Sequence, residues 1–166
     1  MNNNLIKEIS TIEDLKNRYN KYIDFLKNHD AKNILHSNNN LLHHLKGTMS
    51  ILVGWNVAIY ISTAGLFHSV YGTKDWEAVT TSDRDTVKSF IGDYAESLVW
   101  EFHKLKDRYK DILEGDYSDE MRQNLMAISW ANSLEQNPIG PKAYLHQQWE
   151  PHLKAVDFTK QKYLFL

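Results

Sequence analysis

The sequence has 166 residues, enough for one domain with a sizeable core, and its 42% hydrophobic and 12% aromatic content indicates a compact globule rather than a disordered chain. Its formal net charge of −2 provides no basic field for nucleic-acid binding. Because it has no cysteine, disulfides, thiolate nucleophiles and cysteine-ligated zinc or iron–sulfur sites are excluded.

The N-terminal segment contains no signal-peptide core, and the longest mostly apolar run, residues 57–67, is too short to cross a bilayer. We therefore expect a soluble, cytoplasmic protein without membrane or nucleic-acid partners. No internal repeat or second domain is visible, so a single domain is expected over residues 1–166.

The N-terminal part of the chain predicts one amphipathic helix. Ser10 and Glu13 have the spacing of a capping box, which places the helix at about residues 11–28. Its buried stripe consists of Ile12, Leu15, Tyr19, Tyr22 and Leu26. Residues 33–40 contain three consecutive asparagines and predict a loop that ends in a helix N-cap. His36 in this loop is either an ordinary loop residue or a third imidazole folded over a pocket.

Residues 41–73 predict two short apolar helices that each carry a histidine toward the same interior. The first spans residues 41–54, and its buried face consists of Leu41, His44, Leu45, Thr48, Ile51 and Leu52. The second, at about residues 58–67, ends at His68, 24 positions after His44. Either histidine alone fits a hydrogen-bonded core residue, whereas two in one compact unit also fit a metal or acid/base site.

The longest helix is expected at about residues 83–109, with Thr81 or Ser82 as its cap. Its inward stripe consists of Val87, Ile91, Tyr94, Leu98, Phe102 and Leu105. His103 falls on the opposite side of this helix. Gly92 lies in its middle, where glycine costs about 1 kcal/mol against alanine, and this suggests close packing there.

A further helix starts at Ser118 and carries polar residues on its core-facing side. Asn132 and Glu135 continue an apolar stripe that consists of Met121, Leu125 and Ile128. Buried polar groups must find partners. The two residues therefore either satisfy buried backbone or basic groups, or reach the cavity that contains His44 and His68.

After a turn at residues 137–141, a short helix is expected at about residues 142–150, followed by an apolar tail to residue 166. This segment, which includes Trp149, has too much apolar surface to remain in water. It should pack across the bundle or against a second copy, which makes a homodimer reasonable.

The spacing of His44 to the histidine of the AGLFHS motif resembles the HD-domain superfamily of metal-dependent phosphohydrolases. It is especially close to the hydrolase domain of the Rel/SpoT-type guanosine-tetraphosphate enzymes, and HSVYGT is similar to the signature of a small bacterial family related to HD domains. The resemblance covers about residues 41–136. It implies an all-α helical bundle with an HD-like core, in which His44 and His68 would be metal ligands.

The carboxylates of the superfamily do not carry over to this chain. Ser69 stands at the aspartate of the His-Asp pair, Gly72 and Thr73 fall on the acidic pair of the Rel/SpoT-like version, and Asn132 best matches the last aspartate. Hard cations such as Mg²⁺ need anionic oxygen ligands. Ordinary Mg²⁺ or Mn²⁺ phosphohydrolysis is therefore not expected, and two imidazoles make a weak site unless a third histidine or Glu135 joins them.

We therefore expect a small-molecule enzyme of hydrolase, lyase or oxygenase type with a histidine-based pocket. Its catalytic residues, acting as acids, bases or ligands of Zn, Fe or Mn, would be His44, His68, Tyr71 and Glu135. Its remaining ligand-binding residues would be His36, Thr48, Ser69, Thr73 and Asn132. The alternatives are a catalytically inactive module that binds a nucleotide-like small molecule, and a structural bundle with hydrogen-bonded histidines.

Overall fold

A computed structural model describes residues 3–36, 39–73 and 79–137, together with Ile139, Trp149 and Leu153; of residues 3–12 it describes the backbone only. The helices in these ranges are α1 (Asn3–Asn28), α2 (Leu41–Gly54), α3 (Ile59–Phe67), α4 (Arg84–Ile91), α5 (Asp93–Lys104), α6 (Arg108–Glu114) and α7 (Asp119–Gln136). Two strands of two residues each, β1 (Leu35–His36) and β2 (Asn39–Asn40), pair antiparallel. The expected all-α fold class is confirmed. None of the described helices combines the length and apolar character that crossing a bilayer would need.

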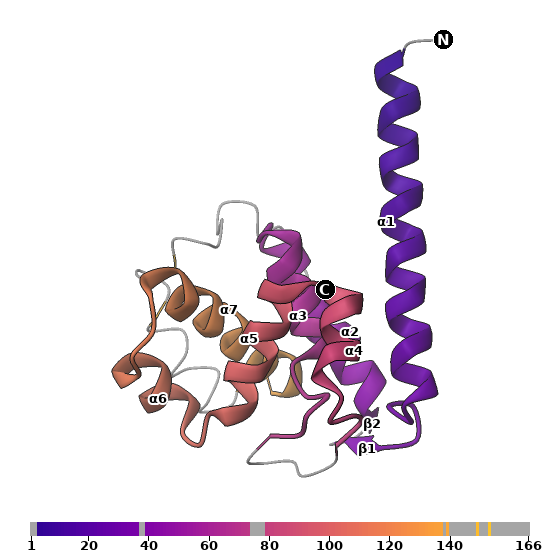
Figure 1. Cartoon of the computed structure of the whole chain (residues 1–166). Coiled ribbons are helices and arrows are strands. Elements are labelled where there is room, and N and C mark those ends of the chain that lie inside the picture. The colour runs from indigo at the N-terminus through magenta and orange to yellow at the C-terminus, as the bar shows by residue number, and fades with distance from the viewer. Residues whose placement is uncertain are drawn as a thin grey trace.

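Helix α3 lies at the centre of the bundle (Figure 1), packed against α2, α5 and α7. Its sequence, IYISTAGLF, contains no charged residue, and every residue from Ile61 to Phe67 is buried. A helix without a polar face can be stable in water only when other elements cover it all round. His68, the C-cap of α3, is therefore buried, with 1% of its surface exposed.

Helix α2 has the predicted bounds and the predicted buried face. Its N-cap is Asn40, whose side chain accepts a hydrogen bond from the backbone N–H of His43. The helix packs closely on α3 because Gly65 has no side chain: a Cβ at that position would lie 2.3 Å from Cδ1 of Leu52.

Helix α1 stands along one side of the molecule, and its N-terminal half projects beyond the other helices (Figure 1). It is already helical at Asn3, so the predicted start at the Ser10 capping box is wrong. The C-terminal half is anchored by aromatic packing: the rings of Tyr22 and Phe25 lie 5.6 Å and 5.8 Å from that of Phe67. The predicted loop that follows contains the β1–β2 pair, in which His36 faces Asn39.

The single long helix predicted for residues 83–109 is wrong, because the chain breaks into α4 and α5 at Gly92. This glycine has φ 86° and ψ 160°, a conformation that is essentially restricted to glycine. Asp83, not Thr81 or Ser82, caps α4 and accepts from the backbone N–H of Thr86. Glycine at this position therefore turns the chain between two helices instead of allowing close packing inside one.

Replacing Gly92 with alanine is expected to destabilise the protein by about 1–3 kcal/mol, the usual cost of forcing a residue with a Cβ into this backbone region. No atom lies within 4 Å of the added Cβ, so the cost would come from the backbone alone. Urea unfolding followed by circular dichroism measures it, with Ser89→Ala on the exposed face of α4 as the control. An unchanged unfolding midpoint in Gly92→Ala would contradict this account of the helix break.

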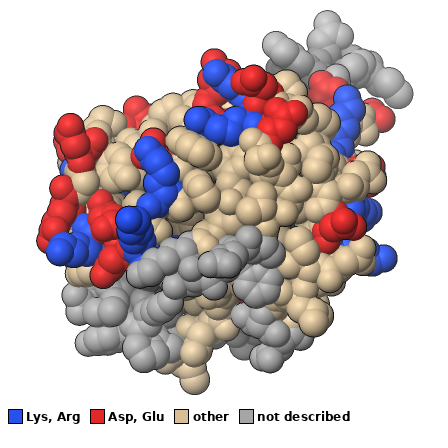
Figure 2. Space-filling model, turned by 60° about the horizontal axis from the view of Figure 1, so that its bottom comes forward, with Lys and Arg blue, Asp and Glu red and all other residues tan. Residues whose placement is uncertain are grey.

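The charged side chains on the face in Figure 2 are mixed in sign, and no continuous patch of one sign lies among the described residues there. The helix and apolar tail predicted for residues 142–166 fall outside the described residues, apart from two positions. Trp149 is buried and stacks on Tyr109 with ring centroids 5.1 Å apart, and Leu153 is buried as well. The expected burial of Trp149 is confirmed.

Candidate functional site

Four polar side chains meet where α2, α3 and α7 pack together: His44, His68, Asn132 and Glu135. His44, His68 and Asn132 are 2%, 1% and 1% exposed, so they lie in the core of the fold. Nε2 of His44 is 3.2 Å from Nε2 of His68 and 3.0 Å from Oδ1 of Asn132. Asn132 and Glu135 both reach His44 because they are three residues apart in α7 and therefore lie on the same face of that helix. We call these four side chains the histidine cluster.

The outer nitrogens of both rings are held by groups that can only accept hydrogen bonds. Nδ1–H of His44 donates to Oε2 of Glu135, and Nδ1–H of His68 donates to the backbone carbonyl of Gly65 at 2.8 Å. In a neutral imidazole, a proton on Nδ1 leaves a lone pair on Nε2. The two Nε2 atoms that face each other therefore both present lone pairs when the rings are neutral.

Burial favours the neutral form of His68. Loss of hydration lowers the pKa of His68 well below its usual value, and the neighbouring His44 lowers it further. The hydrogen bond to the carbonyl of Gly65 acts in the opposite direction and is outweighed. A buried neutral imidazole is the form in which histidine serves as a metal ligand.

With both rings neutral and protonated on Nδ1, three acceptor atoms converge without a donor among them: the two Nε2 atoms and Oδ1 of Asn132. The amide nitrogen of Asn132 is buried and has no hydrogen-bond partner in the described part of the chain. Exchanging the amide oxygen and nitrogen would give His44 a donor but would leave His68 without one. Buried acceptors left without a partner are costly, so this arrangement calls for a proton or a cation between the rings.

The arrangement shares one feature with metal-bound histidines. Metal-bound histidines usually donate their second ring N–H to a carboxylate or a backbone carbonyl, as His44 and His68 do here. Tetrahedral ligand atoms about 2.0–2.2 Å from a zinc ion lie roughly 3.4 Å from one another. The distances of 3.2 Å and 3.0 Å from Nε2 of His44 are shorter than this and equal ordinary hydrogen-bond lengths, so a bound zinc ion would require the side chains to move slightly apart.

The donor set limits which metal would fit. Among the described residues, no group of three or more His, Cys, Asp or Glu side chains is arranged to hold a metal ion. The third inner donor is an amide, and Glu135 reaches only the outer nitrogen of His44. Neutral nitrogen and amide donors suit Zn²⁺ or Fe²⁺ better than Mg²⁺.

His36 covers the histidine cluster from the β1 strand. Its ring stacks on that of His44 with centroids 4.2 Å apart and planes 10° from parallel, and its Nε2 lies 3.4 Å from Nε2 of Gln136. Burial and the nearby His44 lower the pKa of His36 to about 4, so the ring is neutral at pH 7. The structure therefore brings a third imidazole to the cluster, where it packs on the flat face of the His44 ring.

Three other predicted ligand-binding residues lie on α2 or in the turn after α3. Thr48 follows His44 by one turn of α2, and its hydroxyl is buried without a partner among the described groups. Ser69 and Thr73 are buried in the turn that leaves α3. The described hydrogen bonds do not connect these two side chains to the cluster.

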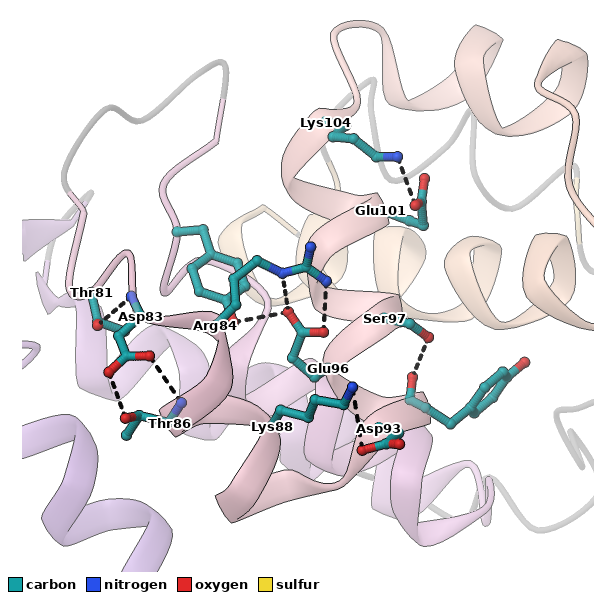
Figure 3. Close-up of polar contacts among 12 residues, drawn as sticks. Thr81, Asp83, Arg84, Thr86, Lys88, Asp93, Glu96, Ser97, Glu101 and Lys104 are labelled. Atoms are coloured by element: carbon teal, nitrogen blue, oxygen red, sulfur yellow. Dashed lines mark hydrogen bonds and ion pairs between the residues drawn. The ribbon is translucent and has the colours of Figure 1, made fainter.

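Tyr71 belongs to a separate polar group around Glu96. Its hydroxyl donates to Oε1 of Glu96 at 3.0 Å, and Arg84 donates to the same carboxylate at 2.7 Å and 2.8 Å. Figure 3 shows the two hydrogen bonds from the Arg84 guanidinium to the Glu96 carboxylate. Burial, followed by the hydrogen bond and charge of Glu96, raises the pKa of Tyr71. The structure therefore does not bring this phenol to the histidine cluster.

A cavity of about 430 Å³ lies between α1, α2 and α3, away from the histidine cluster. Its lining is mainly apolar and consists of Leu15, Lys16, Arg18, Tyr19, Tyr22, Met49, Ile59, Tyr60, Thr63 and Ile91. None of the cluster residues takes part in it. Its titratable lining groups are Lys16, Arg18 and three tyrosines, and its described lining contains no histidine or carboxylate.

The comparisons with known proteins identify one family. The family model described as "Domain of unknown function (DUF6817)" matches residues 25–108, just over half of the chain. The chain belongs to the DUF6817 family. The match includes His36, His44 and His68 of this DUF6817 protein, whereas Asn132 and Glu135 lie beyond it. No match was found among curated proteins or among solved structures.

Sequence reasoning overlooked Gly47, which lies next to the histidine cluster. A Cβ on Gly47 would lie 2.6 Å from Cγ and 2.9 Å from Oε1 of Glu135. A glycine three residues after an inward histidine in a helix was the available signal, because glycine costs about 1 kcal/mol at such a position unless a neighbour requires the space.

Proposed function

We propose that this DUF6817 protein is a small-molecule enzyme whose site is a carboxylate-depleted variant of the HD-domain site and works with one divalent cation such as Zn²⁺, Fe²⁺ or Mn²⁺. The observation that carries the proposal is the pair of Nε2 atoms, 3.2 Å apart, whose rings are both held from behind by acceptors. HD-superfamily descent is part of the proposal. It is supported by the spacing of His44 and His68 in the sequence and by Asn132, whose Oδ1 lies 3.0 Å from Nε2 of His44.

In this proposal the inner donors are Nε2 of His44, Nε2 of His68 and Oδ1 of Asn132. A cation bound there would supply Lewis-acid polarisation of a substrate oxygen and lower the pKa of a bound water. The protein's own contribution is orientation: Gly65 and Glu135 fix the two rings, and the His36 ring shields one face of His44 from water. The dry surroundings strengthen every electrostatic interaction at the site.

Ordinary Mg²⁺-dependent phosphohydrolysis is not part of the proposal. Ser69 and Asn132 stand where the superfamily has aspartates, and the carboxylate of Glu135 is on the far side of the His44 ring. Three neutral donors leave the full charge of a bound cation uncompensated. Such a site favours a substrate that brings an anionic or strongly polar oxygen to it.

A second candidate is a catalytically inactive module that keeps the site for a small, nucleotide-like ligand. The near-complete burial of both rings, at 1–2% exposure, favours it, because an enzyme must also admit substrate and release product. Both candidates share the same buried donors. Turnover is what separates them.

The test is metal analysis of protein purified without a histidine tag, together with replacement of the metal by Co²⁺. The proposal expects about one equivalent of Zn, Fe or Mn after dialysis, visible d–d absorption of the Co²⁺ form, and metal-dependent hydrolysis of an activated ester or phosphodiester. Metal without turnover across a broad substrate panel would favour the binding module. A protein that takes up none of these metals at micromolar concentration would contradict the metal site.

A further inference from the structure

We propose that Glu135 is a positioning residue that keeps the His44 ring in the tautomer with a lone pair on Nε2, and that Gly47 makes the space for it. The role of that lone pair as a metal ligand rests on the proposed function. The tautomer of His44 is independent of the metal and can be measured in the metal-free protein.

The contact between Glu135 and His44 determines what the cluster can do. The carboxylate accepts from Nδ1–H of His44, so a neutral ring carries its lone pair on Nε2. Without Glu135, the proton would move to Nε2, where the lone pair of His68 lies 3.2 Å away and would accept it. The two rings would then be joined by a hydrogen bond, and His44 would have no lone pair left with which to bind a cation.

The two rings are fixed by different means. The His68 tautomer is set by the main-chain carbonyl of Gly65 at 2.8 Å, which no side-chain substitution removes. The His44 tautomer depends on a side chain that comes from α7, 91 positions along the chain. Glu135 is therefore the replaceable component of the arrangement, and its removal changes the proton position on one ring only.

Gly47 explains how the carboxylate reaches the ring. Residues three apart on a helix are neighbours on its surface, so Gly47 lies beside His44 on the side that faces α7. The Glu135 side chain crosses α2 at this point, since an added Cβ would lie 2.6 Å from its Cγ. Alanine at position 47 would occupy that path and push the carboxylate away from Nδ1 of His44. The Glu135 side chain is 17% exposed, so it has solvent into which it can move.

The experiment is ¹⁵N NMR of metal-free protein labelled at histidine, at mildly alkaline pH, where unperturbed imidazoles are neutral. In the wild-type protein, His44 is expected to show a protonated Nδ1 and an unprotonated Nε2. Glu135→Ala and Gly47→Ala are expected to shift the proton toward Nε2, while Ser50→Ala on the exposed face of α2 leaves the pattern unchanged. The proposal fails if the wild-type ring carries its proton on Nε2, or if His44 keeps the Nδ1–H form in Glu135→Ala.

Metal titration separates this proposal from the proposed function. Loss of an outer partner of a metal-bound histidine typically lowers affinity 10–100-fold, and we expect that range for Zn²⁺ in Glu135→Ala. If wild-type protein shows the expected tautomer but binds no metal, the positioning role stands and the metal site fails. If the Glu135→Ala variant binds metal as tightly as the wild-type protein does, the metal site stands and the positioning role fails. Should Gly47→Ala not fold, Glu135→Ala alone decides.

Discussion

His68→Ala is expected to abolish stoichiometric metal binding, lowering the affinity for Zn²⁺ by more than the 10–100-fold that loss of an outer partner typically costs. The substitution removes one of only two imidazoles among the inner donors and leaves one imidazole and one amide. Two neutral donors are too few for a stable zinc site, which normally has three or four protein ligands. His44→Ala should have the same effect. Metal analysis and competition with a chromophoric chelator measure it.

His43→Ala is the matched control for these variants. It lies next to His44 on the same helix, but its side chain is exposed and only its backbone N–H takes part in the Asn40 cap. Its metal content should equal that of the wild-type protein. Circular dichroism would show whether the variants remain folded. A folded His68→Ala protein that keeps one equivalent of metal would mean that the metal is bound elsewhere.

Arg84→Ala is expected to destabilise the fold by about 2–4 kcal/mol, because it leaves the carboxylate of Glu96 buried without its charged partner. Glu96 is 2% exposed and receives two hydrogen bonds from Arg84, at 2.7 Å and 2.8 Å. Because the Arg84 side chain is 41% exposed, we expect a smaller loss of unfolding free energy than the largest losses found for fully buried ion pairs. Its guanidinium also lies 4.1 Å from the ring centroid of Trp100, and that contact would be lost as well.

Lys88→Ala provides the control for the Arg84 variant. Lys88 lies on the same helix and pairs with Asp93 at 3.7 Å, with both side chains well exposed (Figure 3). Exposed pairs contribute little, so the expected change is within about 0.5 kcal/mol. Urea unfolding measures both variants. Similar changes in unfolding free energy for Arg84→Ala and Lys88→Ala would show that solvent, rather than Arg84, compensates the charge of Glu96.

The effect of Arg84→Ala should depend on pH. Burial raises the pKa of Glu96, but the hydrogen bonds from Arg84 and Tyr71, the charge of Arg84 and, least of these, the charge of Lys88 outweigh it, so the net pKa is lowered. A carboxyl group with a lowered pKa stabilises the fold above its unfolded pKa, and this contribution is lost as the pH falls through its folded pKa. The destabilisation by Arg84→Ala should therefore be larger at neutral pH than at about pH 3. Equal values at both pH values would contradict the ion-pair explanation.

The helices around the histidine cluster could be predicted from hydrophobic periodicity, because each buries one continuous face. The predicted bounds of α2 agree with the structure for that reason, and α7, predicted to start at Ser118, begins at Asp119 with Ser118 as its N-cap. The break at Gly92 could not be predicted in the same way. Apolar residues lie on both sides of it in the sequence, and the predicted stripe includes Tyr94. In the structure Ile91 and Ala95 are buried, whereas Tyr94 is exposed, because the backbone angles of Gly92 redirect the chain.

The inward orientation of His44, His68, Asn132 and Glu135 follows from the same periodicity, but their individual contacts do not. Which ring nitrogen faces which partner depends on how α7 docks on α2, and a one-dimensional pattern does not contain that information. Tyr71 illustrates the limit. It follows His68 by three residues and is buried as an aromatic residue should be, yet its hydroxyl points to Glu96, whose buried charge needs donors.

The family match ends at residue 108, before α7 begins. An expression fragment cut at that boundary would retain both imidazoles but lose the amide and the carboxylate that face them. It would also open the apolar sides of α2 and α3 to water, because α7 packs against both. Such a truncated protein would tend to aggregate, so biochemical work on this protein should use chains that contain α7 and also the buried residues Trp149 and Leu153.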